Sequence, residues 1–170
     1  NDMSESLSAI GTRLIIDKDK NVIKKFIKHQ CCSESEALPL YLDYVSNWEN
    51  YEYFLPSEIT IEDDNIVISQ ELYGSSILLN RDFDLTLLND IFEPILELCN
   101  YARSKKIYAD PHIKNFTCNL KNIRYVDFSP PYSNKYNDLV LSKAKSNIEK
   151  NILEKNCVFF RWDWLPYHFA

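Results

Sequence analysis

The N-terminal part of the chain has short runs of β-branched and other apolar residues, a composition that is typical of β-strands. Two such runs, over residues 13–16 and 21–27, flank a polar turn, and two more, over 57–61 and 65–69, flank an acidic turn. Strand-like runs that are separated by short polar turns indicate antiparallel hairpins. The pattern therefore predicts an antiparallel sheet before residue 70.

Between the two hairpins, apolar residues recur with the helical period of three to four. Residues 33–48 are expected to form a helix, because Ser33 and Glu36 have the spacing of a capping box at its start. Pro39 lies close enough to this start to shorten or offset the first turn. The sequence thus predicts one helix inserted between the two pairs of strands.

The second half of the chain is predicted to be helical apart from one hairpin. A broad apolar face predicts a helix over residues 84–103, which Pro94 is expected to kink or divide. Short β-rich runs over 116–118 and 123–126 predict a hairpin. A looser apolar stripe predicts a final helix over 137–155.

Composition limits the class of protein. The chain has 170 residues, 45% of them apolar and 14% aromatic, so a single domain with a packed core is expected, with the aromatic-rich residues 157–169 against that core. A net charge of −6 argues against a nucleic-acid partner. No apolar run is long enough for a transmembrane helix. Five cysteines without a Cys-x-x-Cys pair suggest a reducing compartment, so a cytoplasmic protein is expected.

Candidate chemistry gathers around the predicted hairpin of the second half. Asp110 and Asn115 precede the first strand, and Asp127 follows the second. Because the open ends of a hairpin's strands lie close together, these three side chains can converge. Carboxylate and amide oxygens are suitable ligands for Mg²⁺, which keeps part of its water shell and shares the rest with phosphates.

The same residues resemble the catalytic core of the protein-kinase-like superfamily. Asp110 and Asn115 have the spacing of its Asp-x-x-x-x-Asn segment, and Asp127-Phe128-Ser129 resembles its Asp-Phe-Gly segment. The position of His112, two residues after Asp110, is most similar to that of the histidine in aminoglycoside-phosphotransferase-type kinases and ABC1-type atypical kinases. The resemblance implies an α+β, two-lobed fold in a single domain over 1–170: an antiparallel-sheet lobe over 1–69, a hinge over 70–74 and a reduced helical lobe over 75–170.

The resemblance also implies roles for individual residues. Asp110, Lys24, Asn115 and Asp127 would be catalytic, and Asn115 and Asp127 would hold the metal. ATP would be bound by Gly11, Thr12, Val22, Lys24, Glu36, Ser69, Gln70, Glu71 and Leu72. Glu36 would pair with Lys24 and hold it in position, with Glu34 in reserve. Alternation along the strand puts Lys25 on the opposite face from Lys24, and Lys25 is the competing candidate for the phosphate-binding lysine.

The expected function is an ATP- and Mg²⁺-dependent phosphotransferase that acts on a hydroxyl group, with a small molecule favoured slightly over a protein. Several departures from the family leave a second reading open, a kinase-like module without catalysis: Tyr108 stands before Ala109-Asp110, Ser129 replaces the glycine, and no Ala-Pro-Glu segment follows. Asp110-Pro111-His112 also has the form of a di-metal phosphatase, but that family needs later glycine motifs, and no glycine follows Gly74.

Overall fold

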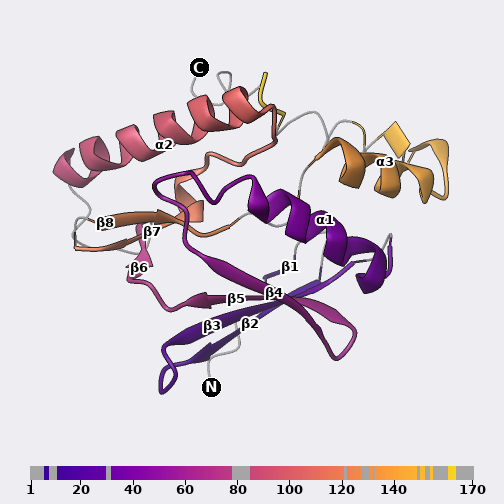
Figure 1. The fold of residues 1–170 in the computed structure, drawn as a ribbon, viewed down its shortest axis with the longest axis horizontal. Coiled ribbons are helices and arrows are strands. Elements are labelled where there is room, and N and C mark those ends of the chain that lie inside the picture. Colours follow the sequence, from indigo (N-terminus) through magenta and orange to yellow (C-terminus); the bar gives the residue numbers. More distant parts are fainter. Residues whose placement is uncertain are drawn as a thin grey trace.

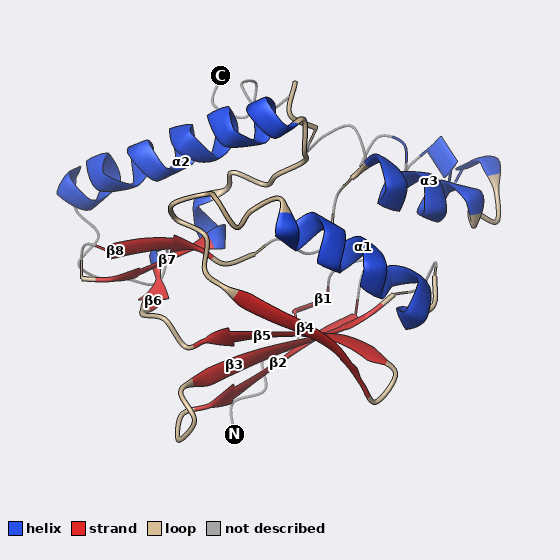
Figure 2. Ribbon diagram, viewed as in Figure 1, coloured by secondary structure: helices blue, strands red, loops and turns tan. Residues whose placement is uncertain are grey.

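The structure is a computed structural model that describes residues 6–7, 11–29, 32–77, 85–120, 122–127, 131, 133–148, 150–151, 154 and 161–163. Its strands are β1 (Ser6–Leu7), β2 (Gly11–Asp17), β3 (Val22–Lys28), β4 (Ser57–Glu62), β5 (Asn65–Glu71), β6 (Ser75–Ser76), β7 (Phe116–Asn119) and β8 (Asn122–Tyr125). Its helices are α1 (Glu34–Ser46), α2 (Leu85–Lys105) and α3 (Asn134–Ser142), with a 3₁₀ turn over Ile113–Asn115. The expected α+β class is confirmed (Figure 2).

The strands form two antiparallel sheets. The larger sheet has the order β1-β2-β3-β5-β4, and the smaller has the order β6-β7-β8. The two predicted N-terminal hairpins are β2–β3 and β4–β5, and they join side by side through β3 and β5. β5 extends through Glu71, so two of the residues expected in the hinge belong to the sheet instead.

Helix α1 covers one face of the larger sheet (Figure 1). Ser33 and Glu36 form the predicted capping box at its start, and Pro39 is accommodated within the helix. Ile27 and Ile66, which are opposite each other on β3 and β5, are fully buried in the same cluster as Tyr41 of α1. Side chains of the larger sheet that point to the same side as Ile27 therefore face the interior of the molecule.

Helix α2 lies over the smaller sheet (Figure 1) and runs unbroken through Pro94, so the expected division at that proline is wrong. The carbonyl of Pro94 accepts a hydrogen bond from the buried Tyr51 hydroxyl at 2.7 Å. An aromatic cluster centred on the fully buried Trp48 fills the space between these elements, with Tyr44, Tyr51, Tyr101 and Tyr125 around it.

Main-chain groups attach the smaller sheet to the rest of the fold at two places. Strand β8 pairs with the segment before β4, because Tyr125 donates its N–H to the Tyr53 carbonyl at 2.7 Å and accepts from Leu55 at 3.1 Å. Gly74 leads into β6 with a φ of 59°, and a Cβ at this position would lie 1.9 Å from the carbonyl oxygen of Cys118. Only glycine fits this close approach of two backbones.

The last predicted helix differs from the structure. Helix α3 begins at Asn134, where the Ser133 side chain caps it, and ends at Ser142. A new helical turn begins at Ser146, whose carbonyl accepts from the Lys150 N–H at 3.0 Å. Serine side chains favour helix starts over helix interiors, so one long helix over 137–155 is wrong. The aromatic tail that was expected to pack against the core lies outside the described residues, except for 161–163.

Candidate functional site

An ion pair between the two sheets marks the candidate site. Lys25 of β3 points toward the interior face, and its Nζ lies 2.7 Å from Oδ1 of Asp127, two residues after β8. The side chains are 23% and 37% exposed, so solvent can reach both groups. The two residues are 102 positions apart in the sequence. A cation from the larger sheet and a carboxylate from the smaller one thus meet at a place that a ligand can approach.

The loop that carries Asp110 is held beside this pair. Asn115 ends the 3₁₀ turn with a side chain that is 2% exposed, and its Nδ2 donates to the main-chain carbonyl of Asp110 at 3.1 Å. Its own carbonyl accepts from the N–H of Val126, the residue before Asp127, at 2.9 Å. Contacts of Asn115 therefore place the loop that carries Asp110 next to the segment that carries Asp127. The convergence of the three side chains on one point stays a prediction.

The carboxylate of Asp110 is oriented by its own loop. One oxygen accepts the His112 N–H at 3.1 Å, and the other lies 3.9 Å from Nζ of Lys114. His112 caps the 3₁₀ turn, because its Nδ1 accepts from the Lys114 N–H at 3.1 Å. His112 is thus engaged in shaping the loop, and the negative charge of Asp110 lies beside a mostly exposed ammonium group.

Tyr108 helps to hold this loop in a way that the sequence did not reveal. Its carbonyl accepts a hydrogen bond of 2.5 Å from the Tyr44 hydroxyl on α1. Its own hydroxyl donates to Oδ1 of Asn134, the first residue of α3, at 2.8 Å. The loop is therefore attached to two helices although tyrosine stands where the resembling family commonly has histidine.

Gln70 joins the site through its side chain. Its Nε2 donates to the Val126 carbonyl at 3.1 Å and to Oγ of Ser57 at 2.9 Å. The neighbouring Leu72 donates its N–H to the Asn21 carbonyl at 2.9 Å. Leu72, one of the residues that the resemblance implied for ATP binding, thus uses its main-chain N–H within the chain.

Tyr125 lies close enough to Asp127 and Asp110 for their charges to act on its hydroxyl. Burial is the main cause that raises the pKa of this hydroxyl well above the ordinary value of 10.0, and Tyr44, Asp127 and Asp110 raise it further. The buried phenol is therefore uncharged, and the charged side chains of the site are Lys25, Asp110, Lys114 and Asp127.

The choice of Lys24 as the lysine of the site is not supported by its position. Lys24 pairs with Glu62 at 2.8 Å, and because β5 lies between β3 and β4, this pair crosses β5 on the face that does not carry Lys25. Val22 and Ser69, which were expected beside the nucleotide, lie on that same face. Val22 and Lys24 share a face because of alternation along β3, and Ser69 of β5 is the partner of Lys24, so all three depend on the same choice of face.

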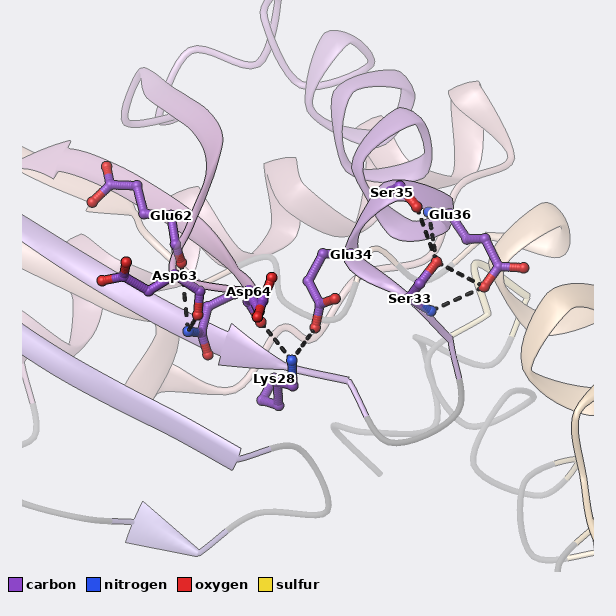
Figure 3. A network of polar contacts seen from close by, with 9 residues as sticks. Lys28, Ser33, Glu34, Ser35, Glu36, Glu62, Asp63 and Asp64 are labelled. Carbon is purple, nitrogen blue, oxygen red and sulfur yellow. Dashed lines mark hydrogen bonds and ion pairs between the residues drawn. The ribbon is translucent and has the colours of Figure 1, made fainter.

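The expected pair between Lys24 and Glu36 is wrong, because Glu36 has other partners. Glu36 accepts the Ser33 N–H at 2.9 Å (Figure 3). It also lies 3.0 Å from Lys143, and these hydrogen bonds lower its pKa to about 2. The reserve candidate, Glu34, lies 2.7 Å from Nζ of Lys28. Lys28 also donates to the Asp64 carbonyl of the β4–β5 turn at 2.7 Å. Both glutamates thus anchor the start of α1.

The remaining nucleotide residues that the resemblance implied lie along strand ends. Gly11 begins β2 opposite Lys28, and Thr12 follows on the face that also carries Lys25, whereas the loop before Gly11 is outside the described residues. Glu71 ends β5 and accepts from Nδ2 of Asn21 at 3.3 Å. None of these contacts tests a role in nucleotide binding.

A metal at this site would have few protein ligands. Across the described part of the chain, no three or more His, Cys, Asp or Glu side chains are grouped to hold a metal ion. Asn115 and Asp127 offer an amide oxygen and a carboxylate. This small donor set fits Mg²⁺, which commonly takes one or two protein ligands with phosphate oxygens and water.

Comparisons with known proteins do not identify a family for this chain. No protein-family model matches the chain, and no curated protein matches it either. Within the described ranges, none of the helices has both the length and the apolar character that are needed to cross a bilayer.

Proposed function

We propose that the chain is an ATP- and Mg²⁺-dependent phosphotransferase that moves the γ-phosphate to a hydroxyl acceptor. In this proposal the domain over 1–170 is a reduced, two-lobed kinase-like fold, with the larger sheet in one lobe and α2 and the smaller sheet in the other. The observation that carries the proposal is the pair of Lys25 and Asp127, set beside the hydrogen bond between Asn115 and the Asp110 main chain.

Lys25 is proposed to bind the phosphates in place of Lys24. It lies on the interior face of β3, with Leu14 directly opposite on β2 and Ile23 two residues earlier on the same face. Apolar side chains beside a cation suit a ligand that has a flat base and a charged tail. Ile23 thus takes the place that the resemblance gave to Val22.

Asn115 and Asp127 are proposed to hold Mg²⁺. A bound Mg²⁺ would neutralise negative charge on the phosphates. Phosphoryl transfer depends mainly on such charge neutralisation and on positioning, and little on covalent catalysis by the protein. The Asn115 amide is fixed in orientation, because its Nδ2 donates to the Asp110 carbonyl. Asp127 pairs with Lys25, and the residue before it, Val126, donates its N–H to the Asn115 carbonyl.

Asp110 is proposed to accept a hydrogen bond from the acceptor hydroxyl, orient it and take its proton. Its side chain is 21% exposed, which leaves it accessible from solvent. The nearby ammonium of Lys114 adds positive charge where the transferred group would pass. A small-molecule acceptor remains slightly favoured over a protein, by the resemblance of the loop around His112.

A reducing compartment such as the cytoplasm belongs to the same proposal. Two cysteines among the described residues, Cys99 and Cys118, are free thiols. Burial raises the pKa of the Cys99 thiol to about 11, which keeps it protonated and unreactive at neutral pH.

The test compares two Asp→Asn variants that keep shape and remove one negative charge. Asp110→Asn is expected to lose most of the turnover with little loss of Mg·ATP affinity, because Asp110 acts on the acceptor. Asp127→Asn is expected to weaken nucleotide binding and turnover together, because Asp127 holds the metal. Binding is measured by titration calorimetry, and turnover by ATP consumption and by transfer of labelled phosphate to a cell lysate. Unchanged transfer by Asp110→Asn would show that Asp110 is not the base.

The second candidate function is a kinase-like module without catalysis. It is favoured by one observation: the N–H of Leu72 donates to Asn21 and is not open to adenine. If the wild-type chain binds Mg·ATP but transfers phosphate neither to lysate components, nor to itself, nor to water, this second function replaces the first.

A further inference from the structure

At one of its two edges, the larger sheet is open along a defined stretch of the described residues. In these residues β1 pairs with β2 at Gly11 and Thr12, through Leu7 and Ser6. The turn after β2 begins at Lys18. Among the described residues, no strand pairs with residues 13–17 on the side away from β3. Since successive residues of a strand direct their N–H and C=O groups to opposite sides, every second residue of this stretch presents them at the edge, and such edges are ready to pair with another strand.

The side chains of this open edge are unusually apolar. Leu14, Ile15 and Ile16 are 39%, 42% and 51% exposed, and they alternate between the two faces of the sheet. Exposed edge strands are commonly protected by proline, by an inward-pointing charge or by a bulge. Residues 14–16 carry none of these, while Arg13 and Asp17 stand at the two ends with opposite charges.

We propose that the edge of β2 pairs with the same edge of a second copy of this chain, in an antiparallel arrangement about a two-fold axis at Ile15. A two-fold axis perpendicular to the sheet keeps each side chain on its own face of the combined sheet. Residues that are directly opposite each other must share a face, whereas neighbours along a strand do not. The axis must therefore pass between a residue and the same residue of the second copy. In the register centred on Ile15, Leu14 lies opposite Ile16 of the second copy, and Arg13 lies opposite Asp17.

The sequence favours this register over its neighbours. A centre at Leu14 would place Arg13 opposite Ile15, and a centre at Ile16 would place Ile15 opposite Asp17. Both alternatives oppose an apolar side chain and a charge, whereas the centre at Ile15 pairs apolar with apolar and positive with negative. It also uses all five open residues, since β1 limits one end of the edge and the turn limits the other.

Sedimentation equilibrium of the full chain over a wide range of concentration tests the pairing. The mean mass is expected to rise from 20.1 kDa toward twice that value as concentration increases. Ile15→Lys places two like charges at the axis and is expected to keep the chain monomeric. Ile61→Lys is the matched control, because Ile61 is also 42% exposed and lies on the opposite edge strand, β4. Its dimerisation is expected to equal that of the wild type.

Charge reversal tests the register itself. Arg13→Asp alone is expected to weaken the dimer at least tenfold, and the double variant R13D/D17R is expected to restore it. Because the Arg13 guanidinium lies 4.6 Å from the centre of the Phe26 ring, each variant is also checked for an unchanged unfolding temperature. Hydrogen exchange at residues 14–16 provides a second readout, with protection that increases with concentration. A wild-type chain that stays monomeric at every concentration, a dimer that Ile61→Lys but not Ile15→Lys disrupts, or a double variant that does not recover would each overturn the proposal.

Discussion

Replacing Lys25 with methionine separates a ligand-binding role from a structural one. Methionine keeps the length and the apolar stem of lysine and removes its charge. If Lys25 binds phosphate, its loss removes a hydrogen bond between charged groups, which contributes about 1.5–3 kcal/mol. Since each 1.4 kcal/mol corresponds to about a tenfold change in affinity, the dissociation constant for Mg·ATP should rise roughly 10- to 100-fold.

The same substitution should leave the fold largely intact. The pair of Lys25 and Asp127 is 23% and 37% exposed, and partly exposed ion pairs contribute no more than about 1 kcal/mol to stability. Lys24→Met is the matched control, because Lys24 is the adjacent residue and also forms an ion pair, with Glu62 at 2.8 Å on the other face. Its affinity for Mg·ATP should stay within about twofold of the wild type, because comparable surface changes rarely exceed ±0.5 kcal/mol.

Titration calorimetry with Mg·ATP measures the affinities, and urea unfolding measures the stabilities. A larger loss of affinity in Lys24→Met than in Lys25→Met would refute the assignment and restore the opposite face of β3 as the ligand-binding face. Equal, unchanged affinities in both variants would show that neither lysine contacts the nucleotide.

Two further predictions concern stability. His29 is buried between the hydroxyls of Tyr41 and Tyr136, and burial lowers its pKa below 6.5, against the opposing charge of Glu34. As the pH falls below 6.5, the unfolded chain therefore binds a proton at His29 at a higher pH than the folded chain does, and the free energy of unfolding should decrease. His29→Gln should reduce this dependence of the free energy of unfolding on pH. Urea unfolding at several pH values measures it, and the same dependence in wild type and variant would contradict the account. Gly74→Ala should cost more than about 2 kcal/mol, because a left-handed φ and a contact with the Cys118 carbonyl both oppose a Cβ. Ser75→Ala is its control, and equal unfolding midpoints of the two variants would contradict the account.

Local patterns in the sequence were enough to predict most elements. Apolar, β-rich runs around polar turns located β2, β3, β4 and β5 within two residues at each end, and the capping box of Ser33 and Glu36 located the start of α1. These features depend on residues that are near one another in the chain. Asp110 and Asn115 were brought together correctly for the same reason, since the loop between them is short.

To choose between Lys24 and Lys25, one must know which face of β3 points to the interior, and the sequence of the strand alone does not show this. Phe26 and Ile27 are 6% and 0% exposed, so both faces of β3 are buried near its end, and hydrophobicity does not identify the interior one. The partner of Lys24, Glu62, becomes visible only when the strand order β3-β5-β4 is known. Lys24 is flanked by Val22 and Phe26 and Lys25 by Ile23 and Ile27, so the neighbours on each face are equally apolar.

The attachment of β8 to the segment before β4 has a consequence for motion. The two sheets could rotate most easily relative to each other if residues 72–74 were the single connection between them. Tyr125 of the smaller sheet, however, also makes two main-chain hydrogen bonds with Tyr53 and Leu55, far along the chain from Gly74. Rotation about residues 72–74 alone would have to break both bonds. The distance between β3 and Asp127 is thus set by the backbone on two sides, and a ligand is expected to enter by displacing side chains such as Lys25 while the sheets keep their places.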